Sequence, residues 1–247
     1  MTPDDISLAF LIFFLATLYS SVGHAGASGY LAAMALFGLA PQDMRPAALA
    51  LNILVASLGT WRYVRAGQQD WRLLAPFAAA SIPTAFIGGL IHVQPGLYRP
   101  LLGFVLLVSA LHFARTAREA ISQDARTRAP PLAIALAAGG VIGLLSGLTG
   151  TGGGIFLSPL ILTMGWATTR RTSGVASAFI LANSIAGLAG TQFSIGALPG
   201  ALPLWAATAL LGAILGTRLG TRTLPIPGLR YALALVLVIA AAKMVFA

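Results

Sequence analysis

The sequence predicts an all-α fold: a polytopic bundle of transmembrane helices made of two inverted repeats, with about five hydrophobic segments in each and eight to ten in total. Composition is the first observation, because 57% of the 247 residues are hydrophobic and only 9% are charged, whereas a soluble domain carries roughly 25% charged residues. The second observation is a series of long apolar runs. The third is that the second half repeats the order of the first, which is typical of transporters.

The N-terminal transmembrane repeat covers residues 1–114. Its apolar runs predict helices at about 6–22, 29–40, 46–61, 73–92 and 97–114. A polar linker at 115–131 follows, and it is the one long hydrophilic stretch of the chain. The linker ends at Pro130-Pro131, so we place the boundary between the two halves there.

The C-terminal transmembrane repeat covers residues 132–247. Its apolar runs predict helices at about 132–148, 154–165, 172–190, 201–217 and 228–246. A shift of 125 residues places Ser21 on Ser146 and Gly29 on Gly154, so the two halves also match weakly residue by residue. Duplication of this kind predicts a site near the midplane of the membrane, where the repeats meet.

The second segment of each half, at 29–40 and 154–165, is too short to span the ~30 Å hydrocarbon core alone. We therefore expect broken, short helices beside the two clusters of small residues. If all five segments of each half nevertheless cross, nearly all loop arginines fall on one side, and the positive-inside rule makes that side cytoplasmic. If the short segments are re-entrant, the arginines divide almost evenly. The bias favours five crossings, an inner-membrane protein, a cytoplasmic linker and both termini outside the cytoplasm.

The most unusual stretch is the glycine cluster at 147–154, which follows the pattern Gly-x-x-Gly-x-Gly-Gly-Gly. Free N–H groups at a helix start, next to glycines that let a ligand approach, form an anion-binding concavity. Close packing of two helices is the alternative, because small residues also serve that purpose in membranes. The stretch at 21–29 occupies the corresponding place in the first half.

The distribution of polar residues favours an anionic substrate. All six acidic residues lie at termini or in loops, whereas cation transporters and proton pumps usually keep a carboxylate within the membrane. Neutral hydroxyl and amide groups remain within the apolar runs, and they suit an oxyanion. The predicted substrate-binding residues are Ser21, His24, Gly26, Ser28, Asn52, Thr149, Thr151, Gly152, Gly153, Gly154, Ser177 and Asn183.

Several of these residues admit a second interpretation. His24 can bind an anion or carry a proton, or it can be a neutral side chain bonded to the backbone. Each asparagine can serve as an interhelical hydrogen bond. Arg45 and Arg170 are expected to be interfacial anchors, with attraction of anions to the cavity as a secondary role. His92 and His112 lie at segment ends and are expected at the membrane interface.

Other classes of function fit poorly. The chain has no cysteine, so thiolate catalysis and cysteine-bound metals are excluded. The net charge of +9 comes from arginines between apolar segments, so it predicts topology rather than nucleic-acid binding. We expect no enzyme activity, no cofactor and no metal. The expected partners are a small anion, the lipid bilayer and a coupling proton or sodium ion.

The paired small-residue clusters, together with Gly147 to Gly154 followed by an apolar run and Pro159, resemble the TauE/SafE family, also called the toluenesulfonate uptake permease family. The resemblance covers nearly the whole chain. It implies transport of sulfite, sulfoacetate or another organosulfonate, with export favoured. The first cluster departs from the glycine-rich form, since it carries Ala25 and Ala27. A passive small-anion channel and an uptake permease remain the alternatives.

Overall fold

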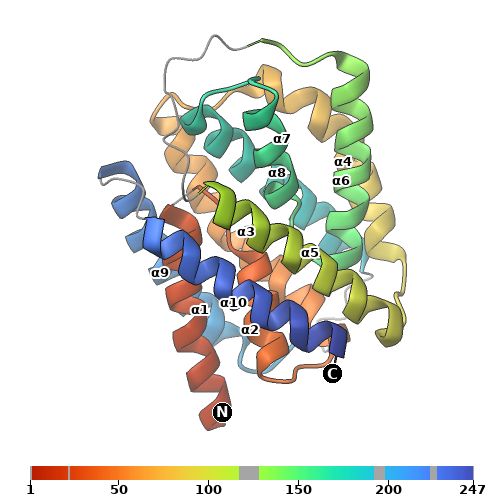
Figure 1. The fold of residues 1–247 in the computed structure, drawn as a ribbon, viewed down its shortest axis with the longest axis vertical. Helices are drawn as coiled ribbons and strands as arrows, with labels where there is room; N and C mark the ends of the chain where they lie inside the picture. Colours follow the sequence, from red (N-terminus) through yellow and green to blue (C-terminus); the bar gives the residue numbers. More distant parts are fainter. Residues whose placement is uncertain (1, 22, 117–127, 192–197, 223–226, 247) are drawn as a thin grey trace.

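The computed structural model describes residues 2–21, 23–116, 128–191, 198–222 and 227–246. Throughout these ranges the chain forms ten helices and no strand, which confirms the predicted all-α class (Figure 1). The helices are α1 (Pro3–Ser21), α2 (Ala27–Leu36), α3 (Pro41–Arg65), α4 (Trp71–Leu90), α5 (Pro95–Thr116), α6 (Leu132–Thr149), α7 (Gly154–Thr163), α8 (Thr169–Gly190), α9 (Leu202–Arg222) and α10 (Pro227–Phe246).

Each predicted segment corresponds to one of these helices, and local signals define several of the ends. Proline lies at the first position of α3, where its missing N–H group is not needed. Asp70 caps α4, because its side chain accepts a hydrogen bond from the Leu73 N–H at 3.1 Å. Most of the predicted linker at 115–131 falls outside the described residues, so its structure stays a prediction.

The outer faces of the bundle are apolar. Within the described part of the chain, α1, α3, α4, α6 and α8 are long and apolar enough to cross a membrane. Large hydrophobic side chains such as Phe10, Phe14 and Val141 are more than half exposed, which water would disfavour and lipid would not. The chain is therefore a multi-pass membrane protein.

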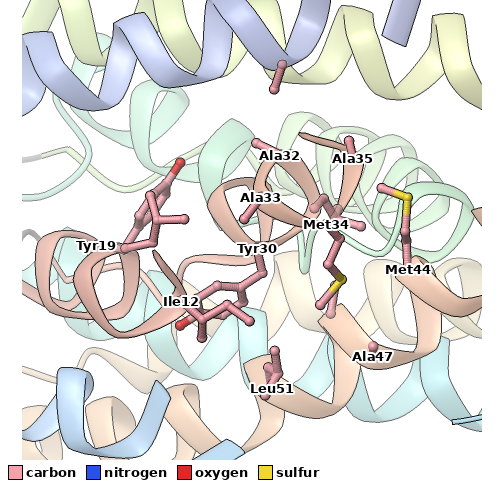
Figure 2. Close-up of a cluster of buried hydrophobic side chains, with 14 of the residues drawn as sticks. Ile12, Tyr19, Tyr30, Ala32, Ala33, Met34, Ala35, Met44, Ala47 and Leu51 are labelled. Carbon is pink, nitrogen blue, oxygen red and sulfur yellow. The ribbon is translucent and has the colours of Figure 1, made fainter. Parts of the chain in front are cut away.

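The two short helices lie inside the bundle. α2 and α7 have 10 residues each, or ~15 Å of helix, about half of the hydrocarbon thickness. Nine of the ten α2 residues are buried, from Ala27 to Ala35. Figure 2 shows Tyr30 and Met34 of α2 among buried side chains of α1 and α3. Short, broken helices are thus present where the small-residue clusters predicted them, and protein surrounds α2 on nearly all sides, whereas α7 is about half buried.

The backbone repeats itself between the two halves. Left-handed glycines occur at Gly23 (φ 81°) and Gly26 (φ 103°), and again 127 residues later at Gly150 (φ 84°) and Gly153 (φ 78°). The ends of α2 and α7 carry the same hydrogen bonds at that spacing, including Leu39 N–H to Met34 O and Trp166 N–H to Ile161 O. The shift of 125 residues used in the sequence comparison is therefore two residues too short in this region.

The two halves are interleaved rather than placed side by side. α4 of the first half packs along α6 and α8 of the second half, and α9 of the second half packs along α1 and α3 of the first. α3 packs against α8 in the interior, and α5 packs against α10 across one face of the molecule (Figure 1). This pairing is unchanged when each helix is exchanged for its counterpart, as an internal repeat requires.

Glycines allow the backbones of α4 and α6 to approach each other closely. A methyl group at Gly139, Gly143 or Gly147 of α6 would lie within 2.4 Å of a carbonyl oxygen of α4. These glycines recur every fourth residue, the small-xxx-small pattern of close helix pairs in membranes. Gly212 and Gly216 of α9 approach α1 in the same way. The backbones of the two halves therefore touch directly at both contacts.

The two ends of the bundle differ in charge. One end, here called the arginine end, carries Arg62 beside Arg218 and the ion pair between Arg171 and Asp70, 3.7 Å apart. The other, the termini end, carries both chain ends (Figure 1). There the Trp205 indole donates to the Asp5 carbonyl oxygen. Arg62, Arg171 and Arg218 thus lie at one end, and the side of the membrane that this end faces stays a prediction.

Candidate functional site

Two non-helical segments separate consecutive helices in the interior of the bundle. The first crossover, residues 23–26, joins α1 to α2, and the second crossover, residues 150–153, joins α6 to α7. Left-handed glycine lets each segment reverse the chain within a few residues, where a side chain would cost roughly 1–2 kcal/mol. Among the described residues, the N–H groups of Gly154 and Ile155 at the start of α7 have no protein acceptor. Both crossovers thus present helix-start donors at depth.

A pocket adjoins the first crossover. Its free volume is about 10 Å³, roughly the room that one water molecule needs. Residues from both halves line it, and they come from α1, α3, α8, α9 and the crossover itself. The lining consists of Ser20, Gly23, His24, Ala25, Val55, Ala56, Gly59, Tyr63, Ser177 and Thr217. We call this the His24 pocket.

The polar groups of the His24 pocket are hydroxyls and one imidazole. Ser177 Oγ donates to Ser173 O at 2.9 Å or to Gly23 O at 3.2 Å, so it ties α8 to the first crossover. Thr217 Oγ1 donates to Ala213 O within α9 at 2.6 Å. Hydroxyls can rotate to donate to a ligand instead. The lining contains no carboxylate and no Lys or Arg, so an anion would meet neutral donors and His24.

The pocket lies toward the arginine end. Tyr63 and Thr217 of its lining are sequence neighbours of Arg62 and Arg218, whose charges interact. Arg62 itself is anchored on α9, where its Nη1 donates to Ile214 O at 3.2 Å. Positive charge beside a cavity raises the local concentration of anions. The electrostatics of the pocket therefore favour a small anion over a cation.

Glycines of both crossovers are closely packed, and a methyl group at Gly23 of the first would lie 2.3 Å from Ser173 Cβ. A methyl group at Gly152 would lie 2.6 Å from Asn52 Nδ2, and one at Gly153 would lie 2.9 Å from Ile142 and Phe179. At Gly154 it would lie 2.3 Å from Ile180. In this conformation, the predicted substrate-binding glycines pack against α3, α6 and α8, and their role in binding stays a prediction.

Buried amides beside the second crossover lack partners. Asn52 donates to Ser184 Oγ at a long 3.4 Å, while its Oδ1 accepts no hydrogen bond from any described residue. Asn183 is fully buried, and neither of its amide atoms has a partner in the described part of the chain. A buried polar group without a partner costs about 1–3 kcal/mol. The region thus holds hydrogen-bonding capacity that the protein itself does not use.

The termini end is closed above the second crossover. Arg45 donates through Nη2 to Gly88 O at 2.6 Å and Gly89 O at 2.7 Å, and through Nη1 to Ile91 O at 3.0 Å. Arg45 is only 9% exposed, because it is bonded to the carbonyls at the C-terminal end of α4, and its role as an interfacial anchor stays a prediction. Tyr98 of α5 donates to Thr149 O at 3.0 Å and adds to the same closure.

The predicted site residues divide into three groups. His24 and Ser177 line the His24 pocket, and Gly26 lies next to that lining at the start of α2. The residues near the second crossover are Asn52, Thr149, Thr151, Gly152, Gly153 and Gly154, and Asn183 is buried in α8. Apart from Arg45, the remaining three are placed elsewhere: Ser21 donates to Leu18 O, Ser28 pairs with the Tyr19 hydroxyl and Arg170 is exposed at the start of α8.

Sequence reasoning missed three residues of this region. Tyr63 and Thr217 line the pocket, although each lies near the end of a long helix far from either glycine cluster in sequence. His112 was expected at the interface, but its ring centroid lies 6.5 Å from that of His24. No group of three or more His, Asp or Glu that could hold a metal ion occurs among the described residues.

Broken helices inside two interleaved repeats, with a polar pocket between the halves, are typical of membrane transporters. The sequence profile of the "Sulfite exporter TauE/SafE" family matches residues 8–244, and the chain belongs to that family. It is also similar to the "Probable membrane transporter protein y4hK" of Sinorhizobium fredii (strain NBRC 101917 / NGR234), with 41% identity over 247 residues and the full length of both chains. No solved structure matches the chain.

Proposed function

We propose that this transporter moves a small sulfur-containing oxyanion, such as sulfite, sulfoacetate or another organosulfonate, and that it exports this anion across the inner membrane. The His24 pocket is the observation that carries the proposal. Residues of both halves form it, its polar groups are neutral donors and one imidazole, and it contains no carboxylate. A tetrahedral oxyanion accepts hydrogen bonds on several sides, which such a set of donors can satisfy once the pocket widens to admit it.

The position of the pocket supports export as the direction of transport. The arginine end is the cytoplasmic end under the positive-inside rule, and both termini then lie outside the cytoplasm. The pocket lies toward that end, whereas Arg45 and Tyr98 close the opposite end. A site that loads from the cytoplasm suits an exporter. Reporter fusions at residues 120 and 247 test the orientation, and a cytoplasmic C-terminus would contradict it.

The second crossover serves as the counterpart of the first in this proposal. Its helix-start N–H groups and the amides of Asn52 and Asn183 would face the anion once the bundle rearranges toward the termini end. Alternating access between inverted repeats exchanges the conformations of the two halves. The substrate would therefore meet one crossover while loading and the other while leaving.

Counterflow in proteoliposomes tests the function. Purified protein is reconstituted into vesicles loaded with sulfite, sulfoacetate or methanesulfonate, and uptake of the same radiolabelled anion is followed. We expect saturable counterflow for at least one of the three, and little for chloride or for cations. Single-channel currents without counterflow would favour a passive anion channel. Transport that runs only inward under a physiological gradient would favour an uptake permease, and no movement of any of the three anions would sink the proposal.

A further inference from the structure

Eight of the helices sort into two bodies, and each body contains helices of both halves. The α8 body consists of α4, α6, α7 and α8, and the α3 body consists of α9, α1, α2 and α3. Each body becomes the other when every helix is exchanged for its counterpart. In the described part of the chain, the one extensive contact between the two bodies is that of α3 with α8. α5 and α10 pack against each other across one face of the molecule (Figure 1).

Inside each body, backbone lies directly against backbone. In the α8 body, a methyl group at Gly190 of α8 would lie 2.2 Å from Phe86 O of α4, and the α6 glycines approach α4 equally closely. In the α3 body, a methyl group at Gly216 of α9 would lie 2.1 Å from Thr17 O of α1. Contacts this close transmit strain instead of yielding to it. Each body is therefore expected to move as one unit.

The contact between α3 and α8, here called the seam, is built differently, because polar side chains meet there. A methyl group at Gly59 of α3 would lie 3.2 Å from Ser177 Oγ of α8. Asn52 of α3 donates to Ser184 Oγ of α8 across the seam, at a long 3.4 Å. Neutral hydrogen bonds of this kind contribute little net free energy and can be exchanged for others. The seam is therefore the interface of the bundle that yields most easily.

Arg45 fastens the seam at the termini end. It belongs to α3, and its guanidinium donates to three carbonyl oxygens at the end of α4, which belongs to the other body. Its backbone also lies against Gly150, where a methyl group would be 3.1 Å from Arg45 O. Toward the arginine end, Ser177 donates to Gly23 O across the same interface at 3.2 Å. The termini end can open only when the bonds of Arg45 break.

The docking of the last helix in each half differs between the halves. α10 packs along α2, and Lys243 Nζ donates to Leu36 O at 2.8 Å. Their counterparts α5 and α7 touch each other much less. Accordingly, nine of the ten residues of α2 are buried but only five of those of α7. Repeats that fold alike but dock differently indicate one of two conformations that the bodies can exchange.

We infer that transport moves the α8 body against the α3 body along the seam, so that the moving units are mixed bodies and not the two sequence repeats. The inference rests on the proposed function. Gly59 and Ser177 of the His24 pocket belong to opposite bodies. The movement that frees Arg45 at the termini end therefore also changes the pocket at the other end.

Disulfide cross-links test the inference directly, because the chain has no cysteine of its own. Gly59→Cys with Ser177→Cys bridges the seam, and Ala80→Cys with Gly140→Cys bridges α4 and α6 inside the α8 body. The Cβ atoms of the two pairs would lie 3.5 Å and 3.9 Å apart, as in natural disulfides. Counterflow is measured with methanesulfonate, because sulfite cleaves disulfides.

Oxidation of the seam pair should lower counterflow at least tenfold relative to the same protein after reduction with dithiothreitol. Oxidation of the α4–α6 pair should change it less than twofold. Full counterflow through a quantitatively oxidised seam pair, or a block by the α4–α6 pair, would overturn the inference and leave the proposed function intact. Absence of counterflow by the wild-type protein with any of the sulfur anions would instead remove the proposed function.

A distance measurement decides the question if the seam variant does not transport when reduced. Spin labels are attached through thioethers to Phe10→Cys of α1 and Val141→Cys of α6, which are exposed positions on opposite bodies. Arg45→Gln should shift this distance by several ångströms, while Arg72→Gln, at an exposed arginine of α4, should not. The distance from Phe10 to Leu211 of α9, inside the α3 body, should stay constant. An unchanged Phe10–Val141 distance in Arg45→Gln, or an equal shift inside the α3 body, would overturn the inference.

Discussion

The two crossovers share one backbone conformation but differ in the groups around them. Glycines are crowded at both, because a methyl group would lie 2.3 Å from Ser173 at Gly23 and 2.6 Å from Asn52 at Gly152. The first crossover adjoins a pocket that residues of four helices help to line. The second lies beside Asn52, whose Oδ1 is buried without a described partner. Because the two halves fold alike, we expect them to exchange these surroundings between conformations of the transporter.

The difference between the two crossovers therefore depends on the conformation of the transporter as well as on the sequence. The pocket lies toward the arginine end, while Arg45 closes the termini end beside the second crossover. We expect the opposite arrangement in a second conformation, with the first crossover closed and the second one open. Four substitutions can break or sharpen this comparison, and they are given in order of the expected size of their effect.

Arg45→Ala should have the largest effect. It removes three charged hydrogen bonds to α4 carbonyls and leaves these acceptors buried, which should lower the free energy of unfolding by about 3–5 kcal/mol. Arg45→Lys should recover only part of this, because an ammonium group cannot span the same set of carbonyls. Thermal unfolding of the purified protein in detergent measures both. Equal stability of all three proteins would mean that Arg45 does not close the termini end.

Gly153→Ala should come next. The added methyl group would lie 2.9 Å from Ile142 and Phe179, and the backbone is left-handed (φ 78°), so we expect a loss of about 2–4 kcal/mol. Gly140→Ala is the control, because a methyl group there meets nothing closer than 3.9 Å and should be tolerated. The midpoint of thermal unfolding compares the two. A Gly153→Ala protein of normal stability that fails to bind anion would show that the second crossover contacts substrate in the present conformation.

Asn183→Leu should separate stability from transport. Its amide is fully buried without a described partner, so an apolar side chain of similar size should stabilise this conformation by about 1 kcal/mol. Transport should nevertheless fall, because the second crossover would lose a donor when it faces the anion. Thermal unfolding and counterflow are measured on the same preparation. Unchanged transport would assign Asn183 to packing alone.

Ser177→Ala and Ser184→Ala form a matched pair on one helix. Ser177 lines the His24 pocket, and Ser184 holds only a long contact to Asn52. Loss of one pocket hydroxyl should weaken anion binding by about 0.5–1.5 kcal/mol, or roughly two- to tenfold, while Ser184→Ala should change it little. Titration calorimetry with sulfite makes the comparison. A larger effect of Ser184→Ala would move the loading site to the second crossover.

The sequence alone predicted where the helices lie along the chain, but it did not predict which residues of different helices lie next to each other. Apolar runs and prolines placed every helix, because length and hydropathy determine what a bilayer accepts. They could not place His112 beside His24 or bury Arg45 under α4. A membrane helix is apolar on its lipid face and on its protein face, so hydrophobic periodicity does not say which way a residue points. A glycine at every fourth residue, at Gly139, Gly143 and Gly147, was the sequence pattern that indicated a close helix contact.

The interleaving of the halves has a consequence for how the protein is made. During synthesis α4 enters the membrane before α6 and α8 exist, so its small-residue face must wait in lipid for partners from the other half. The same holds for α1, whose main partner α9 is made more than half a chain later. Neither half can complete its own interior, and a nascent N-terminal half is an obligate intermediate rather than a finished unit. Quality control in the cell therefore has the whole length of the second repeat in which to recognise and remove a stalled chain.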